Sequence, residues 1–351
     1  MKQRLGRSLA VVAGFGALIG GCAVASHVGA LQPPTAQGTA HIALPPPSAN
    51  WSPQKFQRGI DVDWYTYPNQ PVGEDAAATV LYVQSLHANA ISISFPFFMR
   101  GTQSGSVHAT TATPTPADLA TLITDAHQVG LYVSLRPLLD EKSLGRSRVD
   151  WKPADEAAWF TSYRRFLTPY AVMAKTTKVQ ELIIGTELNE FDISPRWTAL
   201  DRFIRHRYHG TIACAESWSR LVTHGCGVPT FTVDAYHPFG KDRWLRGFET
   251  WDRSLPRGTV QSEVGIAAVQ GAWTRPYKTL WPGSRLDPSV QSRWFSAACT
   301  AAFRTHLGGI YFWAVGLAAH QANGPTETSP TTWTGGPGSR AVAACFKKIA
   351  R

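Results

Sequence analysis

The sequence predicts an α/β protein built as a single (β/α)8 TIM barrel, and three observations predict this fold. Eight short apolar segments of strand length alternate with longer amphipathic segments of helical period. About 300 residues follow an N-terminal leader and linker, enough for one barrel of roughly 250 residues with insertions. Two of the apolar segments end in a glutamate, and the active sites of such barrels lie at the carboxyl ends of the strands.

The first 22 residues are predicted to be an export signal of the lipoprotein type. Lys2, Arg4 and Arg7 precede an apolar stretch at 9–19 that is too short to span a bilayer as a permanent helix. The tetrapeptide Ile-Gly-Gly-Cys that ends at Cys22 resembles a lipobox, in which Cys22 is lipidated after cleavage. The protein is therefore expected to be a membrane-anchored lipoprotein outside the cytoplasm. A secreted or periplasmic protein without the anchor is the alternative.

Residues 23–50 are rich in Ala, Pro and small polar residues and are interpreted as a linker. The folded domain is expected to cover 51–351, with no second domain.

The barrel elements follow one another from there. The expected strands are 59–64, 90–95, 131–136, a strand within 179–190, 211–215, 230–236, 259–263 and 309–313. The expected helices are 74–87, 118–129, 156–174, 195–207, 243–251, 290–306 and 339–349. Gly130 suits the end of the second helix, and Pro195 suits the first turn of the fourth. The segment 100–116 is rich in Gly, Ser and Thr and is expected to be a loop.

Four cysteines remain after Cys22, and an oxidising compartment favours their pairing. Three connectivities are possible. We expect Cys214–Cys226, which closes a short local loop, and Cys299–Cys345, which joins the last two helices. The sequence has no Cys-x-x-Cys or His-x-x-x-His spacing, so neither a metal site nor a cofactor is expected.

Two glutamates, Glu187 and Glu263, each follow a buried strand, and a buried carboxylate needs a partner or a chemical role. A glycosidic bond is cleaved by a pair of carboxyl groups, one giving a proton to the leaving oxygen and one attacking the anomeric carbon. The sequence therefore predicts a glycosidase with these two catalytic residues.

Polar and aromatic residues at other strand ends are the candidates for substrate binding. Each of these residue types can instead have a purely structural role: a strand-end Asp can cap a helix, a His before Pro can belong to a turn, and a Trp can belong to the core. Thirteen Trp and ten Tyr are many for this length, and rings of this kind contact sugar faces. The candidates are Asp61, Asp63, Trp64, Arg136, Asp140, Trp218, Tyr236, His237, Trp273 and Trp313.

Together, the motifs resemble glycoside hydrolase family 113, a family of the clan of retaining (β/α)8 glycosidases, over roughly 56–313. The motifs are RGIDV at 58–62, WFTSY at 159–163 followed by YA at 170–171, IGTEL at 184–188, SEVG at 262–265 and YFW at 311–313. The resemblance implies Glu187 as acid/base, Glu263 as nucleophile and an activity of the endo-β-mannanase type.

Two features depart from the clan. An Asn usually precedes the acid/base, whereas this chain has Thr186 there. An Asn-Glu pair occurs three residues later, which makes Glu190 the alternative acid. The loop after the third strand carries several Arg and Lys residues, which suggests a charged or decorated glycan rather than plain mannan.

The formal net charge of +10 has different meanings in different compartments. Outside the cytoplasm it favours contact with anionic polymers or lipid headgroups over nucleic acid. We expect a monomer that acts on an extracellular or cell-envelope polysaccharide or oligosaccharide and contacts the membrane through its lipid anchor. A non-catalytic glycan-binding protein on the same scaffold and a transglycosylase are the competing interpretations.

Overall fold

Eight parallel strands close into a barrel in the computed structural model, which describes residues 42–46, 56–220, 225–318 and 323–350. The barrel closes because β1 pairs in parallel with β2 on one side and with β9 on the other. The predicted (β/α)8 fold is therefore confirmed. The barrel strands are β1 (Gln57–Asp63), β2 (Ala90–Met99), β4 (Tyr132–Leu139), β5 (Glu181–Thr186), β6 (Thr211–Ser217), β7 (Thr230–Asp234), β8 (Val260–Val264) and β9 (Gly309–Gly316).

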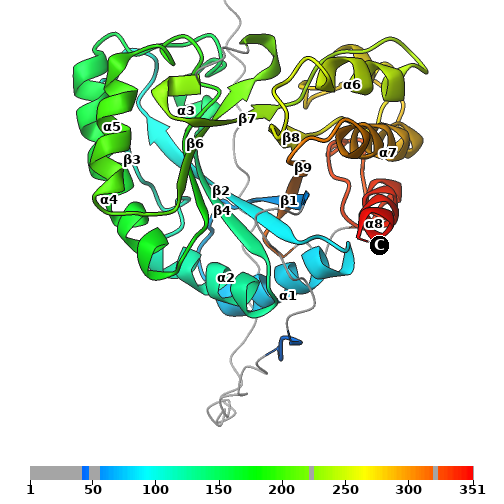
Figure 1. The fold of residues 1–351 in the computed structure, drawn as a ribbon, viewed down its shortest axis with the longest axis horizontal. Coiled ribbons are helices and arrows are strands. Elements are labelled where there is room, and N and C mark those ends of the chain that lie inside the picture. The colour runs from blue at the N-terminus through cyan, green and yellow to red at the C-terminus, as the bar shows by residue number, and fades with distance from the viewer. Residues whose placement is uncertain (1–41, 47–55, 221–224, 319–322, 351) are drawn as a thin grey trace, which may run out of the picture. The chain divides into compact units, whose positions relative to one another are not determined.

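Helices surround the strands, as Figure 1 shows. Pro195 occupies the first turn of α5, as the sequence predicts. Helix α2 begins at Pro116, two residues before the predicted start at 118, because Thr115 forms a capping box with Asp118. The long helices are α1 (Val72–Ser85), α2 (Pro116–Gln128), α4 (Glu156–Thr176), α5 (Pro195–Arg205), α6 (Trp244–Asp252), α7 (Pro288–Arg304) and α8 (Pro337–Ile349).

Two short elements in the loops were not predicted. The two-residue strand β3 (Val107–His108) pairs antiparallel with the end of β2, and the one-turn helix α3 (Glu141–Leu144) follows β4. Neither is long enough to produce a periodic pattern in the sequence.

Strands β2 and β4 run several residues past their predicted ends. Each contains a proline, Pro96 and Pro137, and proline usually marks the end of a central strand because it has no N–H to donate. In the structure Phe95 is paired with Pro137 and Pro96 with Leu138. The extension carries both strands to the carboxyl end of the barrel, where Asp140 follows β4.

Apolar side chains fill the space between the strands and the helices. Close packing also reaches the barrel interior: a Cβ atom on Gly59 would lie 2.1 Å from the ring of Tyr311 on β9. Only glycine fits at position 59, because any side chain there would collide with the Tyr311 ring on the adjacent strand.

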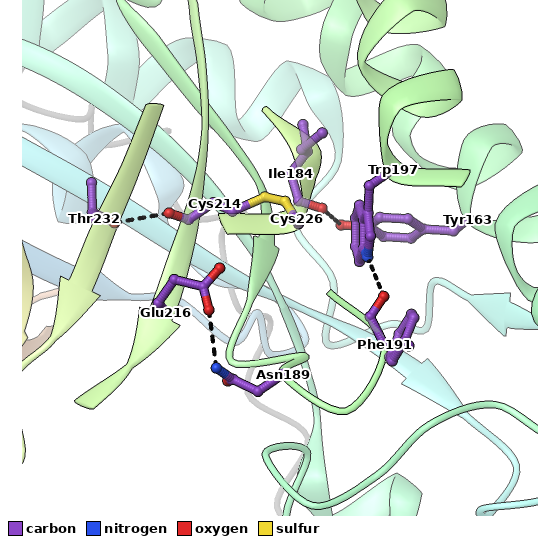
Figure 2. The surroundings of a disulfide bond; sticks show 9 residues. All are labelled: Tyr163, Ile184, Asn189, Phe191, Trp197, Cys214, Glu216, Cys226 and Thr232. Atoms are coloured by element: carbon purple, nitrogen blue, oxygen red, sulfur yellow. Dashed lines mark hydrogen bonds between the residues drawn. A yellow bond between two sulfur atoms is a disulfide. The ribbon is translucent and has the colours of Figure 1, made fainter. Parts of the chain in front are cut away.

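Both expected disulfides are present. Cys299 of α7 is bonded to Cys345 of α8 with a Cα–Cα distance of 6.5 Å, and Cys214 of β6 is bonded to Cys226 with a Cα–Cα distance of 6.2 Å. The Cys214–Cys226 bond lies next to the end of β5 (Figure 2). The predicted pairing is confirmed.

The predicted export signal, Cys22 and most of the predicted linker lie outside the described residues. Within the described ranges, none of the helices combines the length and the apolar character that crossing a bilayer requires.

Candidate active site

Glu187 is the first residue after β5, at the carboxyl end of the barrel. Its backbone N–H donates to the carbonyl oxygen of Ala215 on β6 at 2.8 Å. Its φ of 52° lies in the left-handed region, which non-glycine residues adopt at an energetic cost. The surrounding structure therefore holds the backbone of Glu187 in a conformation that the isolated chain would rarely adopt.

Glu263 lies in β8 with its carboxyl group held from two sides. The Tyr236 hydroxyl donates to one oxygen at 2.7 Å, and the Arg136 guanidinium pairs with the other at 2.5 Å. Arg136 is fully buried and also binds Asp234 at 2.6 Å and the hydroxyl of Thr186 at 3.2 Å. One buried cation thus links β4, β5, β7 and β8 beneath the barrel mouth.

Both glutamates line one cavity of about 740 Å³. A smaller cavity of about 200 Å³ adjoins it and shares five of its lining residues. The predicted binding residues that line the larger cavity are Asp63, Asp140, Trp218, Tyr236 and Trp313. The peptide bond between Trp313 and Ala314 is cis.

The other predicted binding residues do not line either cavity. Asp61 is buried inside the barrel. The ring of His237 packs edge-on against that of Trp218, with ring centroids 5.3 Å apart. Trp64 is 1% exposed and donates to Gln70. Trp273 packs against Trp244. These tryptophans follow strands or lie in loops as expected, but their rings turn into the core.

Four side chains that the structure places in or beside the cavity were not predicted from the sequence as site residues. Arg148 forms an ion pair with Glu187 at 2.9 Å. The Tyr65 hydroxyl donates to Asp140 at 3.0 Å, and the ring of Tyr277 stacks on that of Trp218. Asp234, the partner of Arg136, stands out in the sequence as the one charged residue in an apolar strand. The other three belong to loops, where no periodic signal exists.

Burial raises the pKa of both candidate catalytic carboxyls. For Glu187 the guanidinium of Arg148 opposes the rise. For Glu263 the guanidinium of Arg136 opposes it, and the nearby Glu187 carboxyl adds to it. Burial also raises the pKa of Asp63 to about 6. The charge of Glu187 therefore affects the protonation of Glu263 across the cavity.

Glu190, the alternative acid, lies elsewhere. It lines a separate cavity of about 920 Å³ together with Arg146, Lys152 and Arg196. Glu187 is the residue that shares a cavity with Glu263, so the geometry favours Glu187 as the partner acid.

The Arg136 network gives a stability prediction. Arg136→Met keeps an unbranched apolar side chain but removes the guanidinium and leaves buried carboxyls without their cation, so we expect the free energy of unfolding to fall by about 3–5 kcal/mol. Burial raises the pKa of Asp234 to about 7 even with Arg136 in place. A carboxyl whose pKa is higher in the folded than in the unfolded state stabilises the fold at low pH and loses that effect as pH rises through the folded pKa.

Urea unfolding of the Arg136→Met variant should therefore show a larger loss at pH 8 than at pH 5. Arg205→Met removes a half-exposed ion pair with Asp201 and serves as the control, with an expected loss of about 0–1 kcal/mol at either pH. A loss for Arg136→Met no larger than the control's would contradict the role given to this cation.

Comparisons with known proteins agree with this geometry. No curated protein matches the chain. A family 113 β-1,4-mannanase, solved as a complex, has 17% identity and a TM-score of 0.70, with 84% of this chain and 99% of that chain covered. The family 113 β-mannanase from Alicyclobacillus acidocaldarius has 20% identity and a TM-score of 0.70, with 84% and 98% covered. A xylanase from Cellvibrio japonicus has 10% identity and a TM-score of 0.50, with 83% and 97% covered.

At these identities the solved structures show the fold alone. The family follows from the sequence, because the model described as Glycoside Hydrolase Family 113 matches residues 64–328. The chain therefore belongs to glycoside hydrolase family 113.

Proposed function

We propose that this protein is a retaining glycoside hydrolase that cleaves a β-mannan type of polysaccharide. The observation that carries the proposal is the pair of buried carboxyls, Glu187 after β5 and Glu263 on β8, in the wall of one cavity. A retaining mechanism needs two carboxyl groups about 5–5.5 Å apart. The Glu187 carboxyl raises the pKa of Glu263, which is consistent with two carboxyl groups that face the same cavity.

In the first step a Glu263 carboxylate oxygen attacks the anomeric carbon of the bound sugar. The bond from that carbon to the leaving oxygen breaks, and Glu187 gives its proton to this oxygen. The product of the step is a glycosyl ester on Glu263 and a free sugar hydroxyl.

In the second step Glu187, now ionised, removes a proton from water. The water oxygen attacks the anomeric carbon from the opposite side, and the Glu263 carboxylate leaves. Two inversions at the same carbon give a product with the configuration of the substrate.

The surroundings of the two groups support this division of roles. Glu263 has two partners that favour its ionised form, the Arg136 guanidinium and the Tyr236 hydroxyl. Among the described residues, Glu187 has a direct ion pair with Arg148, which is more exposed than Arg136, and Arg136 lowers the pKa of Glu187 less than Arg148 does. Glu263 should therefore ionise first and leave the proton on Glu187, as nucleophile and acid require.

The cavity wall offers the surfaces that a sugar chain needs. Trp313, Trp218 and Tyr277 present rings to it, and Asp63 has a buried oxygen with no hydrogen-bond partner in the described part of the chain. Carboxylates of this kind accept hydrogen bonds from sugar hydroxyls. The family 113 proteins whose solved structures resemble this chain are β-mannanases, which makes β-1,4-mannan the first substrate to test.

The signal-like N-terminus supports action outside the cytoplasm, with Cys22 as a lipid anchor, and the two disulfides are consistent with an oxidising compartment. The substrate would then be an extracellular or cell-envelope polysaccharide.

The test is hydrolysis of β-1,4-mannan and a panel of neutral and acidic polysaccharides by the purified protein. We expect reducing ends to appear from β-mannan, and NMR of fresh product to show the β-anomer before mutarotation. Retardation in affinity electrophoresis without any product would indicate a glycan-binding protein. Longer oligosaccharides at high acceptor concentration would indicate a transglycosylase, and an initial α-anomer would refute the retaining mechanism.

A further inference from the structure

The loop that carries Glu187 is attached to the end of β6 at two successive residues. The carbonyl oxygen of Ala215 accepts the backbone N–H of Glu187 at 2.8 Å. The carboxyl group of Glu216 accepts the side-chain amide of Asn189 at 3.0 Å (Figure 2). The position of the proposed proton donor thus depends on β6 as well as on its own strand.

The carboxyl group of Glu216 also meets a second carboxyl group from the same loop. Glu216 is 2% exposed, and its side chain hydrogen-bonds with that of Asp192. Two carboxyl groups can share a hydrogen bond only if one of them carries a proton. With the proton on Glu216, its hydroxyl donates to Asp192 while its other oxygen accepts from Asn189. The backbone N–H of Cys226 also bonds with Glu216.

The end of β6 is itself held in place. Cys214, two residues before Glu216, is bonded to Cys226. A Cβ atom on Gly185 of β5 would lie 3.4 Å from the sulfur of Cys214 and 3.0 Å from the ring of Trp197, so the end of β5 packs directly against this disulfide. Glu216 therefore attaches the loop to a strand end that the disulfide and the packing of Gly185 hold in place.

We propose that Glu216 is a positioning residue for the proton donor Glu187, acting through its hydrogen bonds to Asn189 and Asp192. Glu216 does not line the cavity that holds Glu187 and Glu263, so it reaches the reaction through the loop and not through the substrate. The inference rests on the proposed function, because it assumes that Glu187 donates a proton. A displacement of about 1 Å at a catalytic group can cost on the order of 10²-fold in rate.

The pKa of Glu216 agrees with this arrangement. Burial, the Asp192 carboxyl and the Asp234 carboxyl raise it to about 8, and the Cys226 N–H opposes the rise. Below pH 8 the Glu216 proton supports the hydrogen bond to Asp192. Above pH 8 two negative charges face each other, and the loop loses this attachment.

The test compares Glu216→Ala and Glu216→Gln on two substrates. Mannohexaose needs a proton on its leaving oxygen, whereas 2,4-dinitrophenyl β-mannobioside has a leaving group that departs without one. For Glu216→Ala we expect kcat on mannohexaose to fall by roughly 10²-fold. The rate at which the dinitrophenyl substrate glycosylates the enzyme should fall by less than about threefold. Gln can donate to Asp192 and accept from Asn189, so Glu216→Gln should stay within about threefold of the wild type on both.

The pH profile gives a second readout. Because Gln does not ionise, Glu216→Gln should lose the part of the alkaline decline in kcat that centres near pH 8. Glu181→Ala is the matched control: this residue is a buried glutamate at the opposite end of β5, and burial raises its pKa to about 7. Its replacement should lower the melting temperature without any difference between the two substrates.

Equal losses on both substrates for Glu216→Ala would overturn the proposal, as would a Glu216→Gln variant as slow as Glu216→Ala on mannohexaose. A wild type that hydrolyses neither substrate would instead refute the proposed function.

Discussion

Replacing Glu263 with Gln is expected to lower kcat/KM on β-mannan by roughly 10⁴–10⁶-fold, the range expected when a covalent nucleophile is removed. The amide cannot form the glycosyl ester, because it has no carboxylate oxygen to attack the anomeric carbon. Its oxygen can still accept the hydrogen bond of the Tyr236 hydroxyl, which donates to Glu263 at 2.7 Å in the native protein. Arg136 keeps its ion pair with Asp234, so the fold should persist.

The nucleophile can also be identified directly. A 2-deoxy-2-fluoro mannoside with an activated leaving group should add one sugar to the wild-type protein, and mass spectrometry should place it on the peptide that contains Glu263. The Glu263→Gln variant should remain unlabelled. Glu327→Gln, at an exposed glutamate, is the matched control and should keep wild-type rate and labelling. Full turnover by Glu263→Gln, or a label on another residue, would end the proposal.

The sequence predicts the barrel well because its elements have clear periods and long apolar runs. It also places Glu187 and Glu263 at strand ends, where the carboxyl ends of parallel strands meet. Each of these features is local: a strand, its last residue and the turn that follows can be recognised without knowing what packs against them.

The partners of the two glutamates are not local. Arg148 reaches Glu187 from a loop 39 residues earlier, and Arg136 reaches Asp234 across 98 residues. The orientation of a ring is equally hidden: Trp313 lines the cavity, whereas Trp64, directly after Asp63, turns into the core. Such choices depend on tertiary packing, and one sequence carries no signal for them.

Replacing Glu187 with Ala is expected to separate the two chemical steps. On mannohexaose, kcat should fall by roughly 10²–10⁴-fold, because no acid remains to protonate the leaving oxygen. On the dinitrophenyl glycoside the ester should still form, but its hydrolysis should be slow without a base. A burst of dinitrophenol followed by slow turnover is therefore the expected time course, and added azide, which needs no base, should accelerate the second phase.

The pH dependence follows from the protonation of the same residue. Burial raises the pKa of Glu187, so the wild type should lose kcat on mannohexaose as pH rises through that pKa and the acid loses its proton. Glu187→Ala should lack this decline. Glu190→Gln tests the alternative acid: its side chain lines a different cavity from the one that holds Glu263, so it should keep the wild-type rate, time course and pH profile. If instead Glu190→Gln gave the burst and the response to azide, the proton donor would be Glu190, and the cavity shared by Glu187 and Glu263 would not be the place where the glycosidic bond is cleaved.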